Sequence, residues 1–247
     1  DPKSSESALP PFSRGFRDDL MQARALEAQG RSVIHMEIGQ PGTGAPAGAV
    51  AALTQALPRD PMGYSVALGL PALRAGIAAL YQRWYGLDLD PARVVVTAGS
   101  SGAFVLAFTA LFDAGARVGL GEPGYPSYRQ ILRALSLEPV GLPTSLENRL
   151  QPVPADFASV DLDGLIVASP GNPSGTMLDP PAMRALIEAC AARGISFISD
   201  EIYHGLHYEA PAVSALHVSD DVYVINSFSK YFSMTGWRVG WMVVPED

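Results

Sequence analysis

Cysteine and lysine are nearly absent from this chain of 247 residues. A single cysteine, Cys190, excludes a disulfide within the chain and a cysteine-based metal cluster. Only two of the 17 basic residues are lysines, Lys3 and Lys230, and the other fifteen are arginines. An amine with a lowered pKa can act as a nucleophile, whereas a guanidinium cannot. Lys230, which lies between aromatic and small residues, is therefore a candidate for a catalytic role.

Excess positive charge is also lacking. The chain has 17 Lys and Arg against 25 Asp and Glu, which gives a formal net charge of −8. This balance disfavours a nucleic-acid partner, because such a protein needs a basic face to displace counterions from phosphates. Hydrophobic residues make up 48% of the chain, enough to bury a core, and this excludes a disordered protein.

Long hydrophobic runs are missing as well. The most apolar stretch, Ala103–Phe112, ends at Asp113 and falls short of the roughly 20 residues that a membrane span requires. The first residues lack the apolar region of a secretory signal. We therefore expect a cytoplasmic protein without a membrane partner.

The histidines show no metal-binding pattern. His204 and His207 are three residues apart, but no carboxylate–histidine signature surrounds them. We expect no metal site, and we expect Glu201 and Glu209 to belong to a solvated face.

Short β-branched runs alternate with helical patterns along the chain. This alternation predicts an α/β fold with a mostly parallel seven-stranded sheet that helices cover on both faces. We expect residues 1–40 to form an N-terminal arm with one helix at Asp18–Gln29, and residues 41–247 to form one large domain. The expected strands are Val94–Thr97, Arg117–Leu120, Pro139–Leu142, Gly164–Ala168, Ser196–Ser199, Val222–Asn226 and Gly240–Val244.

Polar clusters follow several of these strands, where sites of such sheets gather. Gly99-Ser100-Ser101-Gly102 would expose backbone N–H groups at a helix N-terminus, which suits a phosphate. The alternative is an ordinary turn with a serine cap. Ser227-Phe228-Ser229-Lys230 precedes Arg238, which can pair bidentately with a phosphate. Lys230 near that cation would have a lowered pKa and could form a Schiff base, unless it is a solvated surface lysine.

Four further side chains suit a flat cofactor with a cationic ring nitrogen and a phenolate oxygen. Asp200 and Tyr203 follow one strand, Asn172 stands between two prolines, and Tyr125 could stack on a ring. Each also has a structural alternative. Asp200 could be a helix cap or an ion-pair partner, Asn172 a turn residue and Tyr125 a packed loop aromatic.

Together these segments resemble the pyridoxal-phosphate-dependent aminotransferases of fold type I, classes I and II. The segment Ser227–Gly240 is similar to the family's lysine signature, and residues 169–175 and Asp200–Tyr203 match in order and spacing. The segments Tyr64-Ser65, Gly69–Arg74 and Gly39-Gln40-Pro41 also resemble the family. The resemblance covers about residues 12–244.

The resemblance implies a cofactor, pyridoxal 5′-phosphate, and an amino-group transfer between an L-amino acid and a 2-oxo acid. Lys230 would carry the Schiff base and move the proton, and Asp200 would pair with the ring nitrogen. Asn172 and Tyr203 would bind the phenolic oxygen, and Tyr125 would stack on the ring. The remaining implied roles are phosphate binding by Ser100, Ser101, Ser227, Arg238 and, more weakly, Ser229, a phosphate contact across a homodimer by Tyr64, and a position beside the substrate for Gly39 and Asn172.

Alternative functions share this chemistry. A C–S lyase or a decarboxylase would use the same lysine, because the bond that breaks at Cα depends on how the substrate is oriented. A non-catalytic, cofactor-binding regulatory domain is a third reading, although residues 1–40 show no helix-turn-helix pattern. The arginine that grips the substrate carboxylate in the family has no counterpart here, and we expect it beyond Asp247, in a C-terminal small domain.

Overall fold

The structure is a computed structural model that describes residues 11–36, 39–208 and 210–246, with side chains from residue 20 onward. It divides into two units, Asp1–Pro41 and Gly42–Asp247. In the first unit the expected helix begins earlier than predicted and forms α1 (Pro11–Ala28). Its first residue is a proline, which suits the first helical turn because no helix hydrogen bond requires an N–H there. In the described ranges no helix is long and apolar enough to cross a membrane.

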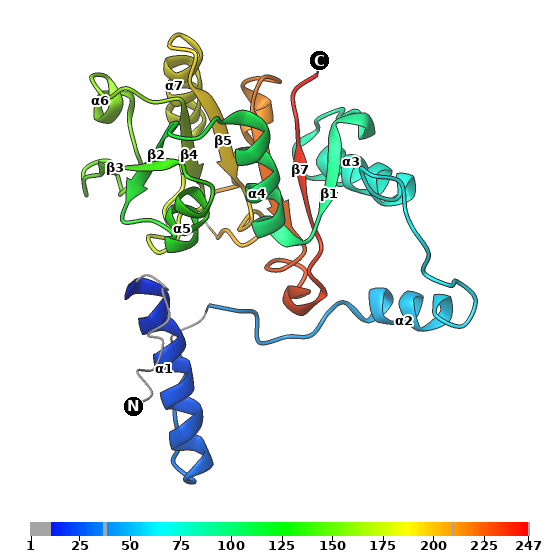
Figure 1. Ribbon diagram of the computed structural model, residues 1–247. Coiled ribbons are helices and arrows are strands. Elements are labelled where there is room, and N and C mark those ends of the chain that lie inside the picture. Colours follow the sequence, from blue (N-terminus) through cyan, green and yellow to red (C-terminus); the bar gives the residue numbers. More distant parts are fainter. Residues whose placement is uncertain (1–10, 37–38, 209, 247) are drawn as a thin grey trace. The chain divides into compact units, whose positions relative to one another are not determined.

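The second unit is built around one sheet of seven strands (Figure 1). The strand order is β1-β7-β6-β5-β4-β2-β3, and β7 alone runs in the direction opposite to the other six strands. The predicted mostly parallel seven-stranded sheet is thus confirmed. The strands are β1 (Val94–Thr97), β2 (Arg117–Glu122), β3 (Glu138–Pro143), β4 (Gly164–Ala168), β5 (Ser196–Asp200), β6 (Tyr223–Ser227) and β7 (Gly240–Val243).

Helices cover both faces of this sheet, as predicted. Successive strand residues point to opposite faces, so Val224 joins one buried cluster and Ile225 the other. The first cluster packs under α3 and α7, and the second packs under α4 and α5. The sequence did not reveal α2, which has no buried residue. The helices are α2 (Ala47–Ala56), α3 (Pro71–Tyr85), α4 (Gly99–Leu111), α5 (Pro126–Ala134), α6 (Pro154–Phe157) and α7 (Pro180–Ala191), with short 3-10 turns at Pro91–Arg93, Ala215–His217 and Thr235–Trp237.

The strand register brings the polar segments to one edge of the sheet. The carboxyl ends of β4, β5 and β6 are neighbours, with Ala168 opposite Asp200 and Asp200 opposite Ile225. β7 starts at the same edge, where Gly240 stands between Thr97 of β1 and Ser227 of β6. The loops that follow these strands carry most of the predicted site residues.

Candidate active site

The N-terminus of α4 lies against β7 and the guanidinium of Arg238. A Cβ added to Gly240 would lie 2.6 Å from the carbonyl carbon of Gly99 and 2.9 Å from the amide nitrogen of Ser100. A Cβ on Gly99 would collide with Nη2 of Arg238, and Gly99 has a left-handed φ of 73°. Both close approaches therefore require glycine. They place the Arg238 guanidinium beside the positive end of a helix, an arrangement that favours an anion.

Two buried serines line the adjoining strand end. Ser227 is 2% exposed and Ser229 is 5% exposed, and the amide of Ser229 donates to Oγ of Ser227 at 3.1 Å. Ser227 pairs with Gly240, which touches the start of α4, so its position is tied to Gly99 and Ser100 through one row of the sheet. Ser101, the next residue in α4, is exposed.

Asp200 is a buried carboxylate at the end of β5. Its Oδ1 accepts the amide of Ile202 at 3.1 Å, and its Oδ2 accepts the hydroxyl of Tyr128 on α5. Burial raises the pKa of Asp200 to about 6, while the bonds from Tyr128 and Ile202 and the charge of Lys230 oppose the rise. The side chain is consequently ionised at neutral pH. Tyr128 was not predicted from the sequence, because it meets Asp200 only in the folded chain.

Lys230 follows β6 and approaches Tyr203. Its Nζ lies 5.9 Å from the centroid of the Tyr203 ring, close enough for a cation–π contact. Burial lowers the pKa of Lys230, Asp200 raises it, and Arg238 lowers it. The turn that carries the lysine is held by Thr235, whose hydroxyl donates to the carbonyl of Ser229 at 2.6 Å. A partly desolvated amine thus stands near both Asp200 and Arg238.

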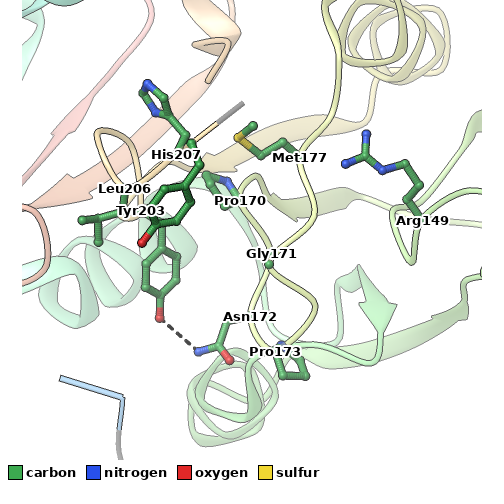
Figure 2. A pocket seen from close by; sticks show the side chains of 11 residues that line it. Arg149, Pro170, Gly171, Asn172, Pro173, Met177, Tyr203, Leu206 and His207 are labelled. Atoms are coloured by element: carbon green, nitrogen blue, oxygen red, sulfur yellow. Dashed lines mark hydrogen bonds between the residues drawn. The ribbon is translucent and has the colours of Figure 1, made fainter. Parts of the chain in front are cut away.

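Asn172 and Tyr203 meet across two neighbouring loops. Nδ2 of Asn172 donates to the hydroxyl of Tyr203 at 3.2 Å (Figure 2). The pair borders a pocket with a volume of about 460 Å³, which Arg149 and His207 also line. Burial raises the pKa of Tyr203, and Asp200 adds to the rise, so the phenol keeps its proton at neutral pH.

Of the remaining predicted residues, Tyr125 lies beside this cluster, Tyr64 is exposed and Gly39 belongs to the other unit. Tyr125 is 41% exposed and meets Tyr128 edge-on, with ring centroids 5.4 Å apart. Tyr64 is fully exposed in the segment between α2 and α3. Gly39 belongs to the first unit, and its role stays a prediction.

The acidic residue after Asp200 corrects one expectation. Glu201 is fully buried, although the sequence suggested a solvated face, because the chain turns inward there and packs the side chain against Ser199 and Ala215. Glu209 lies outside the described residues. Among the residues that the structure describes, no group of His, Cys, Asp or Glu side chains could hold a metal ion.

Comparison with known proteins explains why these side chains lie together. The model of the family "Aminotransferase class I and II" matches residues 31–247. The chain belongs to this family. A valine–pyruvate aminotransferase of Mycobacterium tuberculosis is 46% identical over 243 residues, which cover 97% of this chain and 62% of that protein. A crystal structure of an aminotransferase from the same organism is 44% identical with a TM-score of 0.91, and the match covers 99% of this chain and 64% of that one.

Class I and II aminotransferases depend on pyridoxal 5′-phosphate, and the described residues fit that group. The glycine-lined start of α4 with Arg238 suits a phosphate, the ionised Asp200 suits a protonated ring nitrogen, and Lys230 supplies an amine. The chain spans less than two thirds of the length of the aminotransferases compared above.

Proposed function

We propose that the full-length protein transfers an amino group between an L-amino acid and a 2-oxo acid with pyridoxal 5′-phosphate as its cofactor. The observation that carries the proposal is the position of Lys230. Its partly desolvated amine stands at the sheet edge where Asp200 and Arg238 both act on its pKa. When bound, the cofactor supplies an electron sink for the bonds at the substrate Cα.

The phosphate would be held at the junction of α4, β6 and β7. Arg238 offers a charged fork, and Gly99 and Gly240 allow its guanidinium and β7 to lie close against the start of α4, whose amides would also donate to the phosphate. Hydroxyl groups would provide the remaining hydrogen bonds to the phosphate, from Ser100, Ser101, Ser227 and Ser229.

The ring would lie between Asp200 and the Asn172–Tyr203 pair. Asp200, ionised above about pH 6, would keep the proton on the ring nitrogen. Asn172 and Tyr203 would donate to the phenolic oxygen, and Tyr125 would cover one ring face. Lys230, whose pKa is lowered by burial, would attach the cofactor and then carry the proton at the substrate Cα.

A second copy of the chain would complete the site. Exposed apolar side chains occur in α2 and in the segment that leads from it to α3, a surface that favours burial against a partner. They include Val50, Leu53, Leu57, Met62, Tyr64, Val66, Leu68 and Leu70. We propose a homodimer in which Tyr64 reaches the phosphate of the other subunit, while Gly39 approaches the substrate together with Asn172.

Several predictions from the sequence stay proposals at this level. They are the arm of residues 1–40 and the cofactor-binding domain of residues 41–247, a cytoplasmic location and a role in amino-acid metabolism. The name of the mycobacterial relative makes valine a first donor to try and pyruvate a first acceptor.

The proposal is tested by assaying amino transfer from a panel of L-amino acids to pyruvate and other 2-oxo acids. The full-length protein should convert donor to oxo acid and acceptor to amino acid in equal amounts. Asp200→Ala should keep the cofactor and lose most of this rate, because the ring nitrogen would no longer hold its proton. Release of a thiol or of CO₂ without amino transfer would point to a lyase or a decarboxylase instead.

A further inference from the structure

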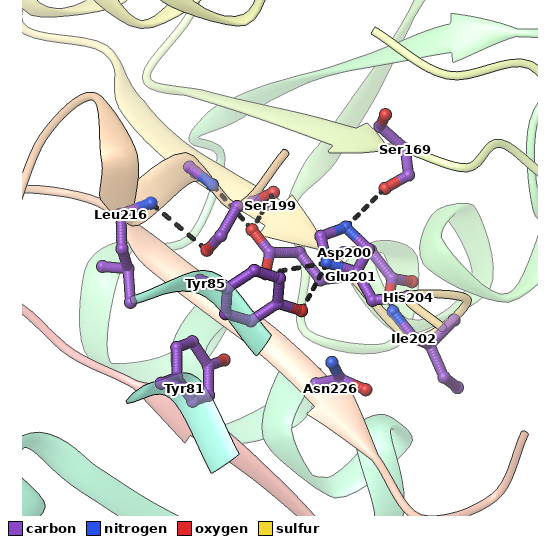
Figure 3. Close-up of polar contacts among 12 residues, drawn as sticks. Tyr81, Tyr85, Ser169, Ser199, Asp200, Glu201, Ile202, His204, Leu216 and Asn226 are labelled. Carbon is purple, nitrogen blue, oxygen red and sulfur yellow. Dashed lines mark hydrogen bonds and ion pairs between the residues drawn. The ribbon is translucent and has the colours of Figure 1, made fainter. Parts of the chain in front are cut away.

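A buried histidine joins the two loops that carry Asn172 and Tyr203. His204 is 1% exposed, and its Nε2 lies 2.9 Å from the carbonyl oxygen of Ser169 (Figure 3). Its Nδ1 lies 2.7 Å from the hydroxyl of Tyr85, the last residue of α3. Neither Tyr85 nor His204 was singled out for such a role by the sequence, and the proposed function does not use them.

The hydrogen-bond partners of His204 determine which of its ring nitrogens carries the hydrogen. A carbonyl oxygen can only accept, so Nε2 of His204 carries the hydrogen and donates to Ser169. Burial lowers the pKa of His204 to about 4, so the ring is neutral at neutral pH and Nδ1 is an acceptor. Burial raises the pKa of Tyr85, so its hydroxyl stays protonated and donates to Nδ1. The Ser169 carbonyl therefore selects the Nε2–H tautomer, and the Tyr85 hydroxyl stabilises it by donating to Nδ1.

The Ser169 end of this chain of bonds is the start of the Asn172 loop. Oγ of Ser169 accepts the amide of Leu178 at 2.9 Å, and the amide of Gly171 donates to Thr176 at 2.9 Å, so the loop is internally closed. A closed loop moves as one piece, and its orientation is fixed where it is attached. His204 supplies one attachment, and it is the residue directly after Tyr203.

We propose that His204, oriented by Tyr85, is a positioning residue that sets the Asn172 loop against Tyr203 for cofactor binding. Two hydrogen bonds thus join the two loops, one from His204 to the Ser169 carbonyl and one from Asn172 to Tyr203. The effect on the affinity for pyridoxal phosphate rests on the proposed function. The positioning of the loop by His204 does not, because it concerns the cofactor-free protein.

Two substitutions of His204 separate the effect of its hydrogen-bond donor from the effect of its size. In His204→Gln the amide nitrogen can replace Nε2 as a donor to Ser169, whereas His204→Met has a similar length and no donor. Hydrogen–deuterium exchange of the full-length, cofactor-free protein should show the peptide 169–178 exchanging about tenfold faster in His204→Met than in wild type, the effect of one lost hydrogen bond. His204→Gln should stay within about threefold of wild type, since its bond is retained. Equal exchange in the two variants would overturn the proposal.

A second measurement covers the case in which His204→Met does not fold. Nitrogen NMR of the histidine rings should show the Nε2–H tautomer for His204 in wild type, and a mixture with Nδ1–H in Tyr85→Phe. An Nδ1–H tautomer in wild type would overturn the proposal.

Titration with pyridoxal phosphate then tests the last step. Affinity should fall about tenfold in His204→Met relative to His204→Gln. If the two variants differ in hydrogen exchange of the loop but bind pyridoxal phosphate equally well, the position of the loop does not affect cofactor binding. A wild-type protein that does not bind pyridoxal phosphate would refute the proposed function. The role of His204 in positioning the loop would then be decided by hydrogen exchange and NMR.

Discussion

At the residue scale, the hydroxyl of Tyr128 lowers the pKa of Asp200. It donates to a carboxylate that burial would otherwise drive towards its neutral form. A hydrogen bond to the charged form of an acid lowers its pKa. Tyr128 thus favours the charge state that a protonated ring nitrogen needs, although it lies outside every motif of the sequence.

We expect Tyr128→Phe to raise the pKa of Asp200 above its value of about 6. The phenyl ring keeps its packing against Phe104, while the hydrogen bond to the carboxylate is lost. Carbon NMR of the labelled Asp200 carboxyl in the cofactor-free protein would measure the change. Tyr125→Phe is the matched control, because it removes a hydroxyl one turn earlier. A Tyr128→Phe protein with an unchanged or lower pKa would contradict the role of Tyr128.

Glu201 is the second residue whose behaviour depends on burial. Its pKa rises from 4.5 to about 8, so the folded chain holds a proton that the unfolded chain releases in this range. Compared with a protein that has a permanently neutral side chain at this position, the folded chain therefore loses stability as the pH rises from 4.5 to about 8. Oε2 of Glu201 has no hydrogen-bond partner among the described residues and lies 3.6 Å from Nδ1 of His204.

The variant Glu201→Gln should remove this pH dependence. Between about pH 5 and about pH 8, the free energy of unfolding of wild type should fall relative to that of the variant by roughly 1–4 kcal/mol. Chemical denaturation at several pH values would measure the difference. Glu188→Gln on the exposed face of α7 is the control and should track wild type. A wild type that gains stability over Glu201→Gln with rising pH would contradict a protonated Glu201.

At the element scale, the junction of α4 and β7 sets the proposed phosphate site. We expect Gly240→Ala to push β7 away from the start of α4, because its Cβ would meet three backbone atoms, two of Gly99 and one of Ser100. Overpacking of this kind costs about 1–3 kcal/mol of stability, and it should weaken cofactor binding as well.

Gly236→Ala is the matched control for this junction. It adds the same methyl group four residues earlier, where no atom lies within 4 Å. Thermal unfolding and cofactor titration of both variants would measure the difference. Equal behaviour of the two alanine variants would show that the contact between β7 and α4 does not matter.

The elements themselves were largely predictable from the sequence. Short β-branched runs bounded by polar residues mark buried parallel strands, and all seven appear close to their expected positions. The helix α2 was missed because its residues are small and apolar with no buried face, so helical periodicity gave no signal. Motif spacing located Lys230, Asp200 and Asn172. It could not locate Tyr85 or Tyr128, because their roles arise only when distant helices pack against the strand ends.

At the scale of the whole molecule, Tyr64 connects the exposed face between α2 and α3 to the proposed dimer. We expect Tyr64→Ala and Lys230→Ala to be inactive separately. Mixed full-length subunits should recover activity towards about a quarter of wild type, because half of the dimers would hold one intact site of two. Subunit exchange followed by an amino-transfer assay would measure this recovery. Absent recovery, with mixed dimers shown to form, would place Tyr64 outside the shared site.

Lys230 is the residue that we propose holds the cofactor. Reduction of the cofactor-saturated, full-length protein with borohydride should fix the cofactor on its amine, and peptide mapping by mass spectrometry locates the label. We expect a pyridoxyl group on Lys230 in the wild-type protein and none in Lys230→Ala. A label on Lys3, or no label from saturated protein, would contradict this role of Lys230.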